Sequence, residues 1–128
     1  METSFISLLE RIIDLINNGK HEAAYIIINK CISTYPGYPL FSQFLLEAKA
    51  IIEIENENYE LALLTLWRLF DDYPDLTHTQ IALAAYIRMM NILEKSVSEK
   101  EAAKFTSFLE RTNQLDFLER TNQLDFLE

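Results

Sequence analysis

Glycine and proline are scarce in this sequence, with two glycines and three prolines among 128 residues. Nor does any stretch alternate apolar and polar residues, which is the pattern of a half-buried strand. A sheet protein needs that alternation and many tight turns rich in these two residues. The two absences therefore exclude a β-sheet fold and favour an all-α chain whose helices are joined by short breaks.

The sequence also has a single cysteine, no long apolar run and fewer basic than acidic residues. The one cysteine, Cys31, cannot form a disulfide within the chain and suits a reducing compartment. No run of about 18 residues is free of charge, and the start METSFISLLERIIDLI lacks the basic segment and cleavage site of a signal peptide. The net charge of −9 disfavours nucleic acid. We therefore expect a cytoplasmic protein with no membrane insertion and no nucleic-acid partner.

Acidic residues outnumber basic ones most strongly in the middle of the chain. Between Pro36 and Asp75 there are eight acids and two bases. This stretch either favours a basic partner at low salt or is a solvated acidic face. With 49% hydrophobic residues, the chain can bury the core of one domain without disulfides.

Apolar residues at helical spacing and regular breaks divide the chain into six expected helices. An apolar stripe in the first ends at Asn-Asn-Gly (17–19), a typical C-terminal stop. Tyr-Pro pairs at 35–36 and 73–74 end the second and fourth helices. Thr77 or Thr79 caps the fifth, and Ser98 with Glu101 has the spacing of a capping box. The expected helices cover residues 4–17, 20–34, 40–55, 59–72, about 77–95, and from 98 onward.

Two segments of the chain repeat each other with a period of 38 residues. One reads GKHEAAYIIINKCISTYPGYP from Gly19, and the other reads ENYELALLTLWRLFDDYPDL from Glu57. A weaker third copy is SEKEAAKFTSFLERTN, in which Glu101-Ala102-Ala103 resembles Glu22-Ala23-Ala24. A repeat of this length is typical of stacked helical hairpins. The matched pairs are Ala24 and Ala62, Ile28 and Leu66, Cys31 and Leu69, Tyr35 and Tyr73, and Pro36 and Pro74.

This pattern resembles the tetratricopeptide repeat (TPR), a helix-turn-helix unit of about 34 residues. That family has a turn glycine, a small residue early in the second helix, a large apolar residue, a second small residue and a closing proline. In the first copy these roles are filled by Gly19, Ala24, Ile28, Cys31 and Pro36. The second copy keeps Ala62, Leu66 and Pro74 but has Glu57 at the turn and Leu69 at the second small site, and the third keeps Ala103.

The resemblance covers roughly residues 4–112. It implies a short superhelix of about three antiparallel helix pairs, forming a TPR-like domain over residues 1–112. A C-terminal helical extension, the duplicated tail of residues 113–128, follows this domain.

The resemblance also places the first helix of each pair along a concave groove. Relatives that clamp a peptide carboxylate need lysine, arginine and asparagine there, so we do not expect that mode of binding. A mostly apolar groove with Glu47 and Glu55 at its rims suits an apolar or amphipathic segment of a protein or peptide partner, ideally with some basic residues. The expected groove residues are Ile6, Leu9, Ile13, Ile16, Phe44, Glu47, Ile51, Ile54, Glu55, Arg88 and Ile92.

Two functions remain as expectations. The first is a non-enzymatic adaptor or chaperone-like protein that binds such a segment in the groove. The alternative is a self-assembling structural protein that uses the same apolar faces and the duplicated tail for homo-oligomer contacts. In that case the groove is covered by the chain itself or by a second copy of it.

Chemical motifs are missing from the sequence. No nucleophile motif accompanies His21 or His78, and neither a phosphate loop nor zinc spacing appears. Cys31 and Trp67 fall on apolar faces and are interpreted as core residues. The acids Glu53, Glu55, Glu57 and Glu60 are interpreted as a solvated linker and not as calcium ligands. We expect no catalytic residues, no metal and no cofactor.

The C-terminus contains the nine residues FLERTNQLD twice, at 108–116 and 117–125. At about 100° per residue, nine residues turn a helix by roughly two and a half turns, so the two copies face opposite sides. One straight helix cannot dock both copies on one core. Either a neutral copying event left the second copy, or it presents Phe117, Leu118 and Leu124 for self-association with a neighbouring chain.

Overall fold

A computed structural model describes residues 2–34, 37–76, 80–96 and 99–112, and these residues form helices without a strand. The expected all-α fold is confirmed, and the helix bounds agree with the sequence pattern to within a few residues. The elements are α1 (Glu2–Asn17), α2 (His21–Thr34), α3 (Pro39–Glu55), α4 (Tyr59–Asp72), the 3-10 helix η1 (Pro74–Leu76), α5 (Gln80–Ser96) and α6 (Glu99–Arg111).

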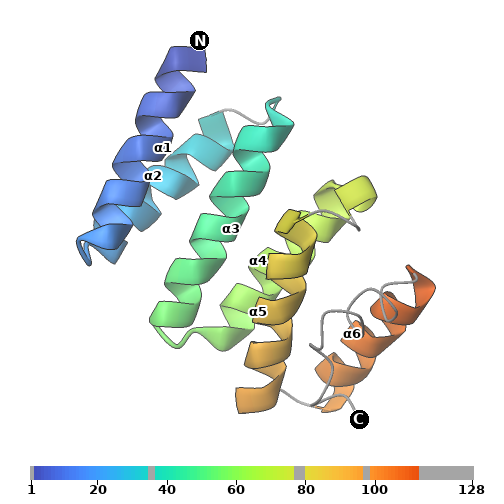
Figure 1. Ribbon diagram of the computed structural model, residues 1–128. Coiled ribbons are helices and arrows are strands. Elements are labelled where there is room, and N and C mark those ends of the chain that lie inside the picture. The colour runs from blue at the N-terminus through green and yellow to red at the C-terminus, as the bar shows by residue number, and fades with distance from the viewer. Residues whose placement is uncertain (1, 35–36, 77–79, 97–98, 113–128) are drawn as a thin grey trace.

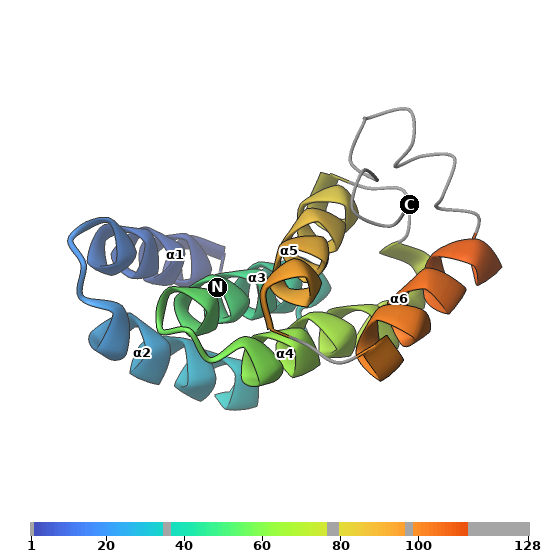
Figure 2. The same cartoon turned by 90° about the horizontal axis from the view of Figure 1, so that it is seen from below.

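The helices form two layers of antiparallel hairpins (Figures 1 and 2). Figure 2 shows α1, α3 and α5 in one layer and α2, α4 and α6 in the other. Each helix from α1 to α4 packs on the next along the chain, and α3 also contacts α5. The first helices of the pairs thus lie together on one face of the molecule.

The turns of the first two hairpins have the same hydrogen bonds, displaced by 38 residues. Lys20 N donates to Leu15 O at 2.8 Å, and Asn58 N donates to Glu53 O at 2.9 Å. These bonds close a Schellman motif, whose C′ residue takes a left-handed conformation. That residue is Gly19 with φ 74° in the first turn and Glu57 with φ 61° in the second. The sequence period is therefore present in the backbone geometry.

The repeated positions of the second helices are also equivalent in packing. Ala24 and Ala62 are both fully buried, which lets the neighbouring helices approach closely. Their partners four and seven residues later are also buried. These are Ile28 and Leu66, and then Cys31 and Leu69.

The core consists of two clusters that meet in α3. The N-terminal cluster joins α1 and α2 to one side of α3, where it includes Leu45 and Ile52. The larger cluster begins with Leu46 and Ala50 on the other side of α3 and continues through α4, α5 and α6. Because α3 belongs to both clusters, it connects the first hairpin to the rest of the molecule.

Helix α6 docks through aromatic side chains. The Phe108 ring lies 5.2 Å from Trp67 and 5.3 Å from Phe70, measured between centroids. Phe105 is fully buried and lies 6.4 Å from both Trp67 and Tyr86. These contacts define which face of α6 points inward.

The third sequence copy does not pack like the first two. Ala103, matched by sequence to Ala24, is exposed, whereas Ala102 packs against the core. The large apolar residues Phe105 and Leu109 set the inward face of α6, and Ala103 lies off that face. The resemblance of Glu101-Ala102-Ala103 to Glu22-Ala23-Ala24 is therefore local and does not extend to packing.

Candidate functional site

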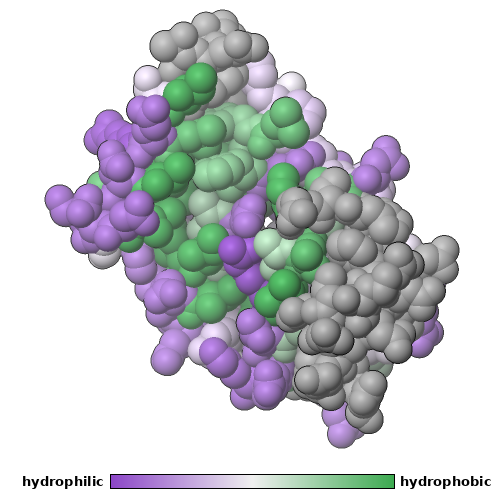
Figure 3. Space-filling model, viewed as in Figure 1, coloured by the Kyte–Doolittle hydropathy of each residue, from purple (hydrophilic) through white to green (hydrophobic). Residues whose placement is uncertain are grey.

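The exposed face of α1 carries apolar side chains that the fold does not cover. Ile6 is 56% exposed and Ile13 is 41% exposed, whereas Leu9 and Ile16 are partly buried against the N-terminal cluster. Figure 3 shows hydrophobic side chains gathered over α1 and α3 on the face that also carries α5. These four residues are the expected groove residues of the first helix, and they do share one side of the molecule.

A recess of about 240 Å³ lies between α3 and α5. Its apolar lining comes from both helices, and its polar groups are carried mainly by α5. Five of its residues were expected from the sequence, namely Ile51, Ile54, Glu55, Arg88 and Ile92. Sequence reasoning missed Tyr59, Asn91 and Lys95. Asn91 and Lys95 follow Arg88 by three and seven residues, so the helical period could have placed both on the same face.

An ion pair crosses from α5 to α3 beside this recess. Arg88 Nη1 donates to Glu47 Oε1 at 3.0 Å, and both side chains are mostly buried. Both residues were expected to line the groove, Glu47 as an acid of its rim, and Arg88 neutralises this carboxylate. Phe44, also expected in the groove, is partly buried on α3.

Two basic side chains of α5, Arg88 and Lys95, line the recess. Lys95 Nζ lies 5.9 Å from the centroid of the Tyr59 ring, in a cation–π contact. Glu55 is the exposed acid of the recess. The polar lining consequently contains both signs of charge and is less acidic than the sequence suggested.

Glu53 belongs to the interior of the protein, and its interpretation as part of a solvated linker is wrong. Glu53 is 1% exposed, and Thr65 Oγ1 donates a hydrogen bond to Glu53 Oε1 at 2.6 Å. The hydroxyl of Tyr25 donates a short hydrogen bond to Oε2 of the same carboxylate. Burial, followed by the hydrogen bond to Glu53 and the carboxylate charge, raises the pKa of Tyr25 to about 12. Glu53 thus joins α2, α3 and α4.

Of the other candidate chemical groups, Cys31 and Trp67 are buried, as expected of core residues. Cys31 is a buried free cysteine. Burial raises the pKa of its thiol, and the nearby positive charge of Lys30 acts in the opposite direction. Trp67 is buried in the larger cluster, with Lys104 Nζ 4.5 Å from its ring centroid. His21 is partly exposed at the start of α2, and His78 lies outside the described residues. Within the described ranges no group of three or more His, Cys, Asp or Glu side chains could hold a metal ion.

The tail residues Phe117, Leu118 and Leu124 lie outside the described residues, so their role stays a prediction. In the part of the chain that is described, no helix is both long and apolar enough to cross a bilayer.

The fold and the site define a chain of packed helical hairpins with an apolar face. Comparison with protein-family models, with curated proteins and with solved structures finds no match for this chain.

Proposed function

We propose that this protein is a TPR-like adaptor or chaperone-like module. It binds an apolar or amphipathic segment of another protein in the groove formed by α1, α3 and α5. The duplicated Schellman turns and the equivalent buried alanines support the repeat interpretation. The single observation that carries the binding proposal is the exposure of Ile6 and Ile13 on the groove face.

The lining of the groove suggests the chemistry of its ligand. Apolar side chains of the partner contact Ile13 on α1 and Ile51 on α3. Its polar side chains meet Glu55, Arg88 and Lys95 at the α5 end of the groove. An amphipathic helix with apolar residues three and four apart presents such a surface. The proposed cellular location is the cytoplasm, which suits a chain with one buried cysteine.

The test is a selection of displayed helical peptides on the wild-type protein. We expect the selected peptides to share apolar residues at spacings of three, four and seven. Ile13→Asp combined with Ile51→Asp should weaken their binding at least about tenfold, since each change places a charge in the apolar contact. The matched control is Ile26→Asp, which changes an exposed isoleucine on α2, outside the groove layer.

Equal binding of the selected peptides to the wild type and the groove variant would overturn the groove assignment. Circular dichroism must first show that both variants are folded. The native mass of the wild-type chain is measured alongside, because a second copy seated in the groove would block peptide capture and appear as a dimer that the groove variant abolishes.

A further inference from the structure

The outward faces of α2 and α4 repeat each other as closely as their buried faces do. Ile26 and Leu64 stand 38 residues apart and are 64% and 66% exposed. Buried positions match because the same packing recurs, whereas exposed positions have no packing reason to match. Leu61, also exposed, extends the apolar surface of α4 by one turn toward its N-terminus.

Charged residues flank these apolar residues in the same order on both helices. Glu22 and Glu60 lie four residues before Ile26 and Leu64, and Lys30 and Arg68 lie four residues after them. All four charged side chains are exposed. Each helix therefore presents an acid, an apolar residue and a base along one line, since residues four apart lie on one helical face.

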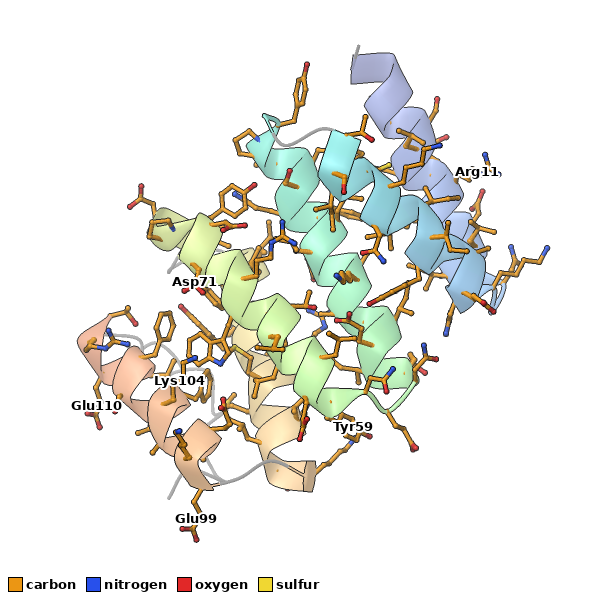
Figure 4. The ribbon with its side chains drawn as sticks, turned by 180° about the vertical axis from the view of Figure 1, so that it is seen from behind. Arg11, Tyr59, Asp71, Glu99, Lys104 and Glu110 are labelled. Atoms are coloured by element: carbon orange, nitrogen blue, oxygen red, sulfur yellow. The ribbon has the colours of Figure 1, made fainter. Side chains whose placement is uncertain are left out.

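The two lines point the same way. Figures 2 and 4 show α2 and α4 in one layer and running in the same direction, with the labelled Tyr59 and Asp71 near the two ends of α4. The acidic ends of both lines thus point toward one end of the layer, and the basic ends point toward the other. This α2/α4 face, defined by Glu22, Ile26, Lys30, Glu60, Leu64 and Arg68, has a charge direction.

A face with this charge direction is complementary to itself when it is reversed. In a two-fold dimer each surface meets its own copy. A two-fold axis that crosses the helices and lies in the interface reverses their direction. Glu60 then meets Arg68 of the second copy while Leu64 packs on its counterpart. An axis along the helices would bring α4 onto α2 of the second copy and Glu60 beside Glu22, an acid beside an acid, which repulsion disfavours.

The surface at the start of α4 suits an incoming base. A shallow recess there is lined by Glu57, Glu60, Leu61 and Leu64, together with Asn58 and Tyr59. A guanidinium entering it finds two carboxylates and an apolar wall for its methylene stem. Arg68 also pairs with Asp72 of its own helix at 3.3 Å, but this exposed pair leaves other guanidinium donors available.

We propose that the α2/α4 face binds the same face of a second copy of this chain, with the helices antiparallel across the interface. The surface is separate from the groove on α1, α3 and α5. A dimer formed in this way therefore leaves both grooves accessible to their partners.

The experiment measures self-association of the full chain by sedimentation equilibrium and native mass spectrometry over micromolar to submillimolar concentrations. We expect a dimer whose dissociation constant rises at least about tenfold in the double variant Ile26→Asp, Leu64→Asp. Both side chains are exposed in the monomer, so the variant should fold, and circular dichroism checks this. The matched control, Ile6→Asp with Ile13→Asp, changes exposed isoleucines of the groove face and should leave the dimer intact.

A charge exchange tests the direction of the helices. Glu60→Arg alone and Arg68→Glu alone should each weaken the dimer, because each creates two like-charge contacts related by symmetry. The two changes in one chain should restore the wild-type dissociation constant. A wild-type chain that stays monomeric would overturn the proposal. So would a dimer that is lost only in the groove variants, or single charge changes without effect.

Discussion

The hydroxyl of Tyr25 on α2 donates a hydrogen bond to the carboxylate of Glu53 on α3, 28 residues further along the chain. Thr65 on α4 donates to the other oxygen of that carboxylate. Three helices therefore share one buried acid, which lies at the junction of the first two hairpins.

Replacing Glu53 tests this junction. Glu53→Gln keeps a polar group of the same shape and should lower the free energy of unfolding by about 1 kcal/mol. Glu53→Leu should cost about 2–3 kcal/mol, because it leaves the Tyr25 hydroxyl without its acceptor. Urea unfolding measures both. Glu55→Gln, at an exposed position, is the control and should change little; equal effects of the three variants would contradict the assignment.

Alkaline pH should weaken the fold through Tyr25. Its pKa is about 12 in the folded protein against 10.0 ordinarily, so the folded state binds the phenolic proton more tightly than the unfolded state. This contribution is complete below pH 10.0 and is lost as the pH rises toward about 12. Burial raises the pKa of Tyr86 as well. Urea midpoints across this range should fall less steeply in the Tyr25→Phe variant; an identical slope would exclude Tyr25 as a source.

Replacing the alanines of the repeat with a larger residue distinguishes the closely packed positions from the exposed one. Ala24→Leu and Ala62→Leu should each destabilise by about 1–3 kcal/mol, because both sites are fully buried and closely packed. Ala103→Leu should be nearly neutral, since Ala103 is exposed despite its sequence match to Ala24. Thermal unfolding compares the three. A large loss at Ala103 would restore the third copy to the repeat.

The two Schellman turns predict that glycine is favoured at both left-handed positions. Glu57 occupies a left-handed conformation that costs a side-chain-bearing residue about 1 kcal/mol, so Glu57→Gly should stabilise the protein by about that amount. Gly19→Ala should destabilise it comparably. A Cβ at Gly19 would have no atom within 4 Å, so the cost there comes from the backbone alone. The shift in melting temperature measures both changes, and equal signs would contradict the shared turn geometry.

The register of α6 depends on Phe105, which precedes the duplicated segment. Phe105→Ala should cost about 3–5 kcal/mol, and more than Phe108→Ala, because Phe108 is only partly buried. A slip by nine residues cannot rescue it, since that slip brings Gln114 to the place of Phe105 and Arg111 to that of Ala102. Denaturant unfolding and the helical circular dichroism signal report the loss; a smaller effect than that of Phe108→Ala would refute this order.

The sequence period was enough to predict the helices, the turns and several residues that line the recess between α3 and α5. Ile51, Ile54, Arg88 and Ile92 were placed together because equivalent residues of stacked hairpins share a face. Glu53 was missed because it was interpreted together with the acids Glu55, Glu57 and Glu60 that follow it. Its hydrogen-bond partners, Tyr25 and Thr65, lie on other helices that come near only in the folded chain, so the local sequence does not predict its burial.

Ala103 shows a second limit of sequence reasoning. The match of Glu101-Ala102-Ala103 to Glu22-Ala23-Ala24 suggested an equivalent helix. The face of a helix that packs on the core is, however, set by its largest apolar residues. In α6 these are Phe105 and Leu109, which turn Ala103 outward. The ion pair of Arg88 with Glu47 was missed for a similar reason, because its partners are separated by 41 residues.

Residues of α3 belong to both core clusters, and we expect the two clusters to differ in stability. Among the residues that the structure describes, the N-terminal cluster contains eight buried residues and is the smaller of the two. We therefore expect the α1–α2 hairpin to open while the remaining helices stay folded. Opening would expose one side of α3 and separate Tyr25 from Glu53. A ligand bound as proposed, against α1 and α3, would bind only the closed form. Its apparent affinity therefore includes the closing equilibrium of this hairpin, and substitutions far from the groove can tune that affinity without touching the ligand.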